Sequence, residues 1–75
     1  MRYRVQILPH IESLESHQSP SSLAKITSKY TPGNSFIVDD QSVDMEGNLW
    51  FKIEGSSEWI PFRLNGKSLL KIVYQ

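Results

Sequence analysis

The sequence predicts a small all-β domain, built as a barrel or a sandwich of five to six short strands. Three observations support this class. Apolar and polar side chains alternate over short stretches, as in Tyr3, Val5 and Ile7 of the first expected strand. Turn-forming residues separate these stretches, beginning with Pro9. No segment of the chain shows a convincing helical period of apolar residues.

The middle of the chain is expected to alternate loops and strands. Residues 10–22 are polar and rich in serine, which favours a long loop over a helical turn. Residues 23–27 are expected to form a short strand or a turn. Residues 31–34 carry a Pro-Gly turn signal, and the dense β-formers of residues 35–39 predict a third strand. A polar connection, residues 40–48, follows.

The two tryptophans stand in two consecutive short strands, expected at residues 49–53 and 59–62. Side chains alternate across a strand, so Phe51 and its apolar neighbours face one side and Trp50 faces the other. Trp59 is out of phase with its apolar neighbours in the same way. If one face packs the core, both tryptophans lean towards a second surface, where a large aromatic ring can serve as a contact platform.

The last expected strand covers residues 69–74, after the preferred hairpin dipeptide Asn65-Gly66. In this strand Leu70, Ile72 and Tyr74 are in phase. The expected core consists of Val5, Phe36, Val38, Phe51, Ile53, Ile60 and Ile72.

Length and composition exclude several classes. Seventy-five residues predict one domain, residues 1–75, and the absence of cysteine excludes disulfides and thiolate chemistry. Eight basic residues balance eight acidic ones and are dispersed, so nucleic acid is not an expected partner. No apolar run is long enough for membrane insertion. The start of the chain lacks a signal peptide, which places the protein in the cytoplasm if it is full-length, or outside it if it is a fragment of a secreted protein.

A series of short motifs extends over almost the whole chain. In order, they are Ser19-Pro20-Ser21, Ile26, Pro32-Gly33, Phe36-Ile37-Val38, Gly47, Trp50-Phe51-Lys52-Ile53 and Trp59-Ile60. This order and spacing resemble the bacterial SH3-like (SH3b) domain family. The chain departs from the family pattern at Glu58, where glycine is common, and at His17-Gln18, where an arginine is common. The Ala-Leu-Tyr-Asp-Tyr run of eukaryotic SH3 domains is absent, so the resemblance does not extend to polyproline binding.

The resemblance implies a single SH3-like domain with a strongly bent barrel, which acts as a targeting or interaction module. Two functions stay open. One is a non-catalytic binding module that recognises peptidoglycan or another cell-envelope component. The other is a cytoplasmic or phage-encoded protein–protein interaction subunit. The partner is accordingly a cell-wall peptide or glycan, or a protein.

Four residues are candidates for ligand binding. Trp50 and Trp59 are expected to stack on a sugar, a peptide or a partner surface, or alternatively to brace the fold. Tyr30, at the edge of the Pro-Gly turn, is a further contact candidate. Lys52 lies two residues after Trp50, on the same face, and favours a ligand with carboxylates.

The sequence offers no catalytic site, and neither a metal site nor a cofactor is expected. The acidic group of Asp39, Asp40, Asp44 and Glu46 lacks the spacing of a calcium loop. His10 and His17 lie among serines, but no nucleophile elbow or orienting carboxylate accompanies them. Two histidines without a third ligand also fall short of a zinc site.

Overall fold

The computed structural model describes residues 1–73, in which strands, turns and loops occur and no helix. The strands are β1 (Tyr3–Ile7), β2 (Leu14–His17), β3 (Ile26–Tyr30), β4 (Ser35–Val43), β5 (Leu49–Ile53), β6 (Trp59–Pro61), β7 (Arg63–Leu64), β8 (Lys67–Ser68) and β9 (Leu70–Val73). The prediction of an all-β protein is therefore confirmed, whereas the expected five to six strands are too few, since the described residues form nine.

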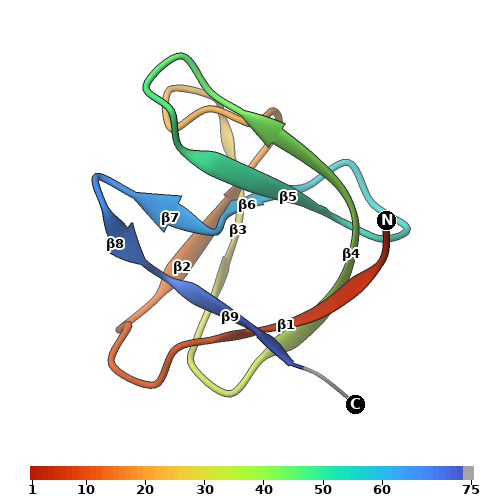
Figure 1. The fold of residues 1–75 in the computed structure, drawn as a ribbon, viewed down its shortest axis with the longest axis vertical. Helices are drawn as coiled ribbons and strands as arrows, with labels where there is room; N and C mark the ends of the chain where they lie inside the picture. Colours follow the sequence, from red (N-terminus) through yellow and green to blue (C-terminus); the bar gives the residue numbers. More distant parts are fainter. Residues whose placement is uncertain (74–75) are drawn as a thin grey trace.

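Seven strands form one sheet in the order β3-β2-β6-β5-β4-β1-β9, and β7 and β8 form a separate hairpin. All strand pairs described are antiparallel. The sheet is strongly curved, and the long strand β4 bends along this curve (Figure 1). Over the described residues β3 and β9 are the ends of the sheet, so its pairing is that of an open sheet.

Strand β4 joins the two halves of the sheet. Its first part pairs with β1, from Ser35 to Val38, and its second part pairs with β5, from Val38 to Val43. The register shifts between Val38 and Asp40, which leaves Asp39 as the extra residue of a β-bulge. A bulge bends a strand and increases its twist. It lies where β4 passes from one half of the sheet to the other.

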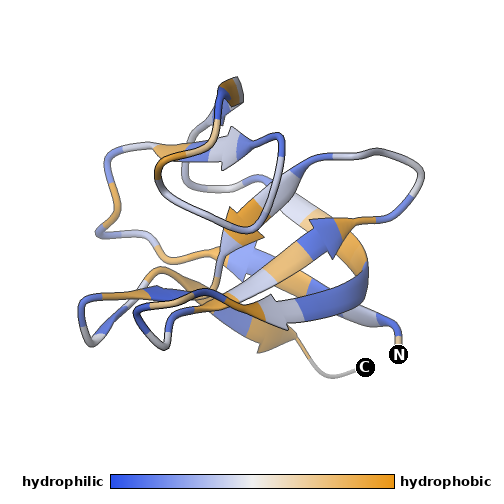
Figure 2. Ribbon diagram, turned by 90° about the horizontal axis from the view of Figure 1, so that it is seen from above, coloured by the Kyte–Doolittle hydropathy of each residue, from blue (hydrophilic) through white to orange (hydrophobic). Residues whose placement is uncertain are grey.

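The core lies inside the curve of the sheet. Its buried apolar residues are Val5, Ile7, Leu14, Val38, Phe51, Ile60 and Leu70. Four of the predicted core residues, Val5, Val38, Phe51 and Ile60, are thereby confirmed. The other three, Ile53, Phe36 and Ile72, are half-buried and pack against this cluster. Apolar and polar residues alternate along the strands that enclose it (Figure 2).

Three boundaries differ from the expectation. Residues 10–22 are not one long loop, because β2 lies within them; Leu14 points into the core although its neighbours are poor β-formers. Residues 23–27 were expected to form a short strand or a turn; Leu23 lies in a turn, and β3 begins only at Ile26 and ends at Tyr30. The third strand continues well beyond Asp39, to Val43, since pairing with β5 holds the polar residues there in extended form.

The hairpin predicted at Asn65-Gly66 is confirmed as the turn between β7 and β8. Both residues have positive φ, 51° at Asn65 and 77° at Gly66, as a two-residue type I′ turn requires. The last strand, β9, begins one residue later than expected and is described as far as Val73. Tyr74, expected to be in phase with Leu70 and Ile72, lies outside the described residues.

Candidate functional site

Trp50 lies inside the molecule and not on a contact platform. Its exposed fraction is 0%, and its indole N–H donates a hydrogen bond to Asp44 Oδ2 at 2.9 Å. The His17 ring packs against the Trp50 ring edge to face, with centroids 5.2 Å apart. Strand β5 is therefore buried on both faces, with Phe51 in the main core and Trp50 on the opposite side. Of the two alternatives expected for Trp50, the structure shows a ring that braces the fold and is not exposed, because β2 and the β4–β5 turn supply partners that enclose it.

Asp44 organises the β4–β5 turn around this tryptophan. Its Oδ1 accepts the backbone N–H groups of Glu46 and Asn48, each at 2.9 Å. The hydrogen bond from Trp50, together with those from Asn48 and Glu46, holds the pKa of the Asp44 carboxyl below its ordinary value. One member of the acidic group is thus a turn residue. Among residues 1–73 no three His, Asp or Glu side chains come together as metal ligands.

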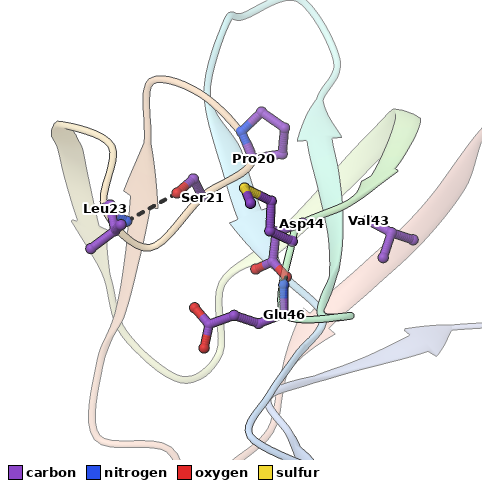
Figure 3. Close-up of a pocket in the computed structure, with 7 residues that line it drawn as sticks. Pro20, Ser21, Leu23, Val43, Asp44 and Glu46 are labelled. Carbon is purple, nitrogen blue, oxygen red and sulfur yellow. Dashed lines mark hydrogen bonds between the residues drawn. The ribbon is translucent and has the colours of Figure 1, made fainter.

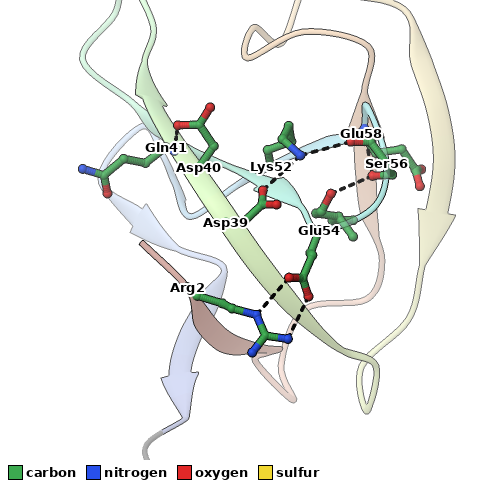
Figure 4. Close-up of polar contacts among 9 residues, drawn as sticks. Arg2, Asp39, Asp40, Gln41, Lys52, Glu54, Ser56 and Glu58 are labelled. Carbon is green, nitrogen blue, oxygen red and sulfur yellow. Dashed lines mark hydrogen bonds and ion pairs between the residues drawn. The ribbon is translucent and has the colours of Figure 1, made fainter.

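Trp59 and Lys52 lie on the same face of the sheet as Trp50, and both are half-buried. In register, Lys52 stands opposite Trp59. The Lys52 ammonium is 3.0 Å from Asp39 Oδ1 and donates a hydrogen bond to the Ser56 carbonyl at 3.2 Å (Figure 4). The contact with Asp39 is an ion pair between two half-buried residues. The Lys52 ammonium therefore has partners within the molecule, Asp39 on β4 and Ser56 in the β5–β6 turn.

Tyr30 does not join the two tryptophans and lies with the core cluster. Its ring packs edge to face on Phe36, at 4.7 Å between centroids. Its hydroxyl lies 3.0 Å from Glu58 Oε2 and 3.1 Å from Oε1. Burial, with the neighbouring carboxylate, raises the pKa of Tyr30.

Glu58 gathers hydroxyl groups from both strands of the β2–β3 hairpin. Ser16 donates to its Oε1 at 2.7 Å, and Thr27 lies 3.2 Å from the same oxygen. These hydrogen bonds, that of Ser16 first, hold the pKa of the Glu58 carboxyl below its ordinary value. In the sequence Glu58 stands out only as a departure from the SH3b motif pattern that the chain resembles. That departure was the one available signal of its role.

The surface has an apolar patch where two loops meet. Leu23 is 93% exposed, Val43 is 62% exposed and Met45 is fully exposed. With Pro20, Ser21, Asp44 and Glu46 they line a shallow pocket of about 240 Å³ (Figure 3). We call these three apolar residues the Leu23–Met45 patch. In the sequence Val43 and Met45 stand in the polar segment of residues 40–48, and two apolar side chains among polar ones were the available signal of an exposed patch.

The two loops that carry the patch are ordered by their own hydrogen bonds. On the β2–β3 side, the Leu23 N–H donates to Ser21 Oγ at 3.1 Å. His17 Nδ1 lies 2.9 Å from the Ala24 carbonyl oxygen and must carry the proton, because a carbonyl only accepts. On the other side, Asp44 fixes the β4–β5 turn. The patch is therefore displayed on a preorganised surface, which lowers the entropy cost of binding.

Comparisons with protein-family models, with curated proteins and with solved structures give no match. Over residues 1–73 the structure contains no helix that is both long and apolar enough to cross a membrane.

Proposed function

We propose that this chain is an SH3-like barrel that works as a non-catalytic protein–protein interaction module and binds its partner through the Leu23–Met45 patch. The barrel topology is supported by the bent strand β4, which pairs with β1 through its first part and with β5 through its second. The order of motifs along the sequence supports the same family.

The observation that carries this function is the exposure of three large apolar side chains that line one pocket, from the β2–β3 loop, the end of β4 and the β4–β5 turn. Single exposed apolar residues are ordinary, but a contiguous group with a polar rim is typical of interaction surfaces. Covering such a group stabilises a complex by about 25 cal/mol for each Å² of apolar surface removed from water.

The rim of the patch indicates the charge of the partner. Asp44 and Glu46 line the same pocket as the apolar side chains, and both are acidic. A second copy of the chain, placed face to face, would bring the two Glu46 carboxylates together, which is unfavourable. A protein segment that carries an apolar side chain beside lysine or arginine complements the patch better.

Peptidoglycan recognition is the alternative function, and it has less support than protein binding through the Leu23–Met45 patch. The SH3b resemblance implies it, with Trp50 among the expected stacking surfaces, and Trp50 is buried. Of the other candidates on that face, Trp59 is half-buried and Lys52 is ion-paired with Asp39.

The experiment compares capture by the wild type with capture by patch variants, on cell lysate and on purified peptidoglycan. Leu23→Ser and Met45→Ser should leave the urea unfolding midpoint unchanged and lose a stoichiometric protein partner, identified by mass spectrometry. Glu46→Lys should lose the same partner by charge reversal. Ile26→Ser is the matched control, because Ile26 is 49% exposed and does not line the pocket.

Two results would overturn the proposal. One is capture of the same proteins, in the same amounts, by the wild type and by all three patch variants. The other is retention on peptidoglycan that survives the patch variants and disappears in Trp59→Ala, which would favour the envelope alternative.

A further inference from the structure

The β2–β3 hairpin is attached to the rest of the sheet by little backbone pairing. Strand β2 meets β6 at the single pair His17 and Trp59, whereas β4 and β5 are paired from Val38 to Val43. Strand β3 pairs with β2 and lies at the end of the sheet. The hairpin thus depends on side-chain contacts to stay in place.

Glu58 makes the polar part of that attachment. It stands outside the hairpin, just before β6, and its backbone N–H donates to Ser56 Oγ at 3.0 Å. The Ser56 hydroxyl donates in turn to the Ile53 carbonyl at 2.9 Å, which fixes the β5–β6 turn. From this position the Glu58 carboxylate accepts hydrogen bonds from the hydroxyl groups of Ser16 on β2 and of Thr27 and Tyr30 on β3.

These contacts make the hairpin sensitive to one side chain. Ser16 is fully buried, and its hydroxyl also lies 2.7 Å from Thr27 Oγ1 and 3.4 Å from the Ser28 carbonyl oxygen, so without Glu58 it is hydrogen-bonded only within the hairpin. The Tyr30 hydroxyl loses its acceptor at the same time. The apolar attachments that remain are Leu14 in the core, the packing of Tyr30 on Phe36 and the packing of His17 on Trp50.

We propose that the β2–β3 hairpin is a hinged flap that opens as a unit, and that Glu58 is the latch that holds it closed. Local opening of this kind occurs in segments with few attachments to the body of the protein. The flap carries Leu23 and Pro20, whereas Met45 stands on the β4–β5 turn outside the flap. Opening the flap therefore separates the two walls of the Leu23–Met45 patch. This consequence for binding rests on the proposed function, but the flap itself does not.

Hydrogen exchange on the free protein tests the flap without a partner. In Glu58→Gln, which removes the charge and replaces one acceptor oxygen by an NH2 donor, the amides of β2 and β3 should exchange at least tenfold faster than in the wild type, while those of β1, β4 and β5 stay within twofold. Glu54→Gln is the matched control, because Glu54 lies in the same turn and accepts hydrogen bonds from Arg2 (Figure 4). It should leave the hairpin amides unchanged.

Tyr30→Phe gives a second reading that keeps the aromatic ring and removes one hydroxyl from the latch. It should raise the exchange rate of the hairpin amides less than Glu58→Gln does.

If Glu58→Gln fails to fold, hydrogen exchange of the wild type in low urea tests the flap instead. The amides of β2 and β3 should then exchange before those of β4 and β5. An equal rise over the whole sheet, an unchanged hairpin, or the same effect in Glu54→Gln would overturn the latch. Loss of partner capture in the patch variants, with an unchanged hairpin in Glu58→Gln, would overturn the flap and leave the proposed function standing.

Discussion

The two tryptophans share an alternation pattern and differ in environment. Trp50 has a hydrogen-bond acceptor, Asp44, and an aromatic neighbour, His17, and it is fully buried. Trp59, on the same face one strand away, is half-buried. A strand pattern fixes which face a side chain takes, but the loops that cover that face decide its exposure.

Replacing Trp50 tests this assignment. Trp50→Ala should lower the free energy of unfolding by about 3–5 kcal/mol, the range for deleting a large buried aromatic side chain. It also leaves the Asp44 carboxylate without its indole donor. Urea unfolding of the variant measures the loss, with Trp59→Ala as the comparison, which should lose less than half as much. A loss below about 1 kcal/mol for Trp50→Ala would place the ring at the surface after all.

Glu58 should make stability depend on pH. Its pKa in the folded protein lies below the ordinary 4.5, chiefly because Ser16 donates to it, with Tyr30 and Thr27 adding to the effect. A carboxyl group with a depressed pKa stabilises the fold above its unfolded pKa, and this contribution is lost as the pH falls through the folded pKa. The difference in urea midpoint between wild type and Glu58→Gln should be constant above about pH 6 and shrink below about pH 4.5. A difference that stays unchanged down to about pH 3 would contradict the role of the charge.

At the scale of elements, turns and strands follow different rules. The β7–β8 turn was predictable because Asn65-Gly66 suits positive φ at both positions, a local property of the backbone. Strand β2 was not predictable, because its sequence, Leu-Glu-Ser-His, has weak strand propensity. It is a strand because β3 pairs with it on one side and Leu14 is drawn into the core.

The turn gives a local test. Gly66 has φ of 77°, and a Cβ added there meets nothing within 4 Å, so only backbone strain opposes a larger residue. Gly66→Ala should cost about 1–2 kcal/mol of stability, the cost of the left-handed region for an ordinary residue. Gly66→Asn is the matched control and should cost less, since asparagine tolerates this region better. Equal losses in the two variants, measured by urea unfolding, would argue against strain as the cause.

At the scale of the molecule, one core is shared by both halves of the curved sheet. Its buried apolar residues come from β1, β2, β4, β5, β6 and β9. With no cysteine in the chain, this packing must supply most of the stability. A cavity made by shortening a core side chain of one strand therefore also removes packing contacts from the other strands.

Phe51 is the residue with which to test how far the stability of the whole sheet depends on this one core. It packs edge to face with Phe62 at 5.3 Å and with Tyr3 at 6.4 Å between ring centroids. Phe51→Ala should cost about 3–5 kcal/mol, enough to unfold much of the population of so small a domain. Ile53→Ala, at a half-buried position of the same strand, should cost less. Urea melts followed by circular dichroism compare the two, and a loss below about 1 kcal/mol at both positions would mean that the phase of β5 is inverted.

The sequence by itself determined the all-β class, the turn at Asn65-Gly66 and the inward face of β5, since local alternation and backbone preference specify these features. Only the tertiary structure decided the environment of Trp50, the existence of β2 and the grouping of three hydroxyls around Glu58. The same holds for the Leu23–Met45 patch, whose residues stand about twenty positions apart in the chain. Each of these depends on which distant segments meet when the sheet curves, and a period of two along one strand carries no information about the segment that will cover it.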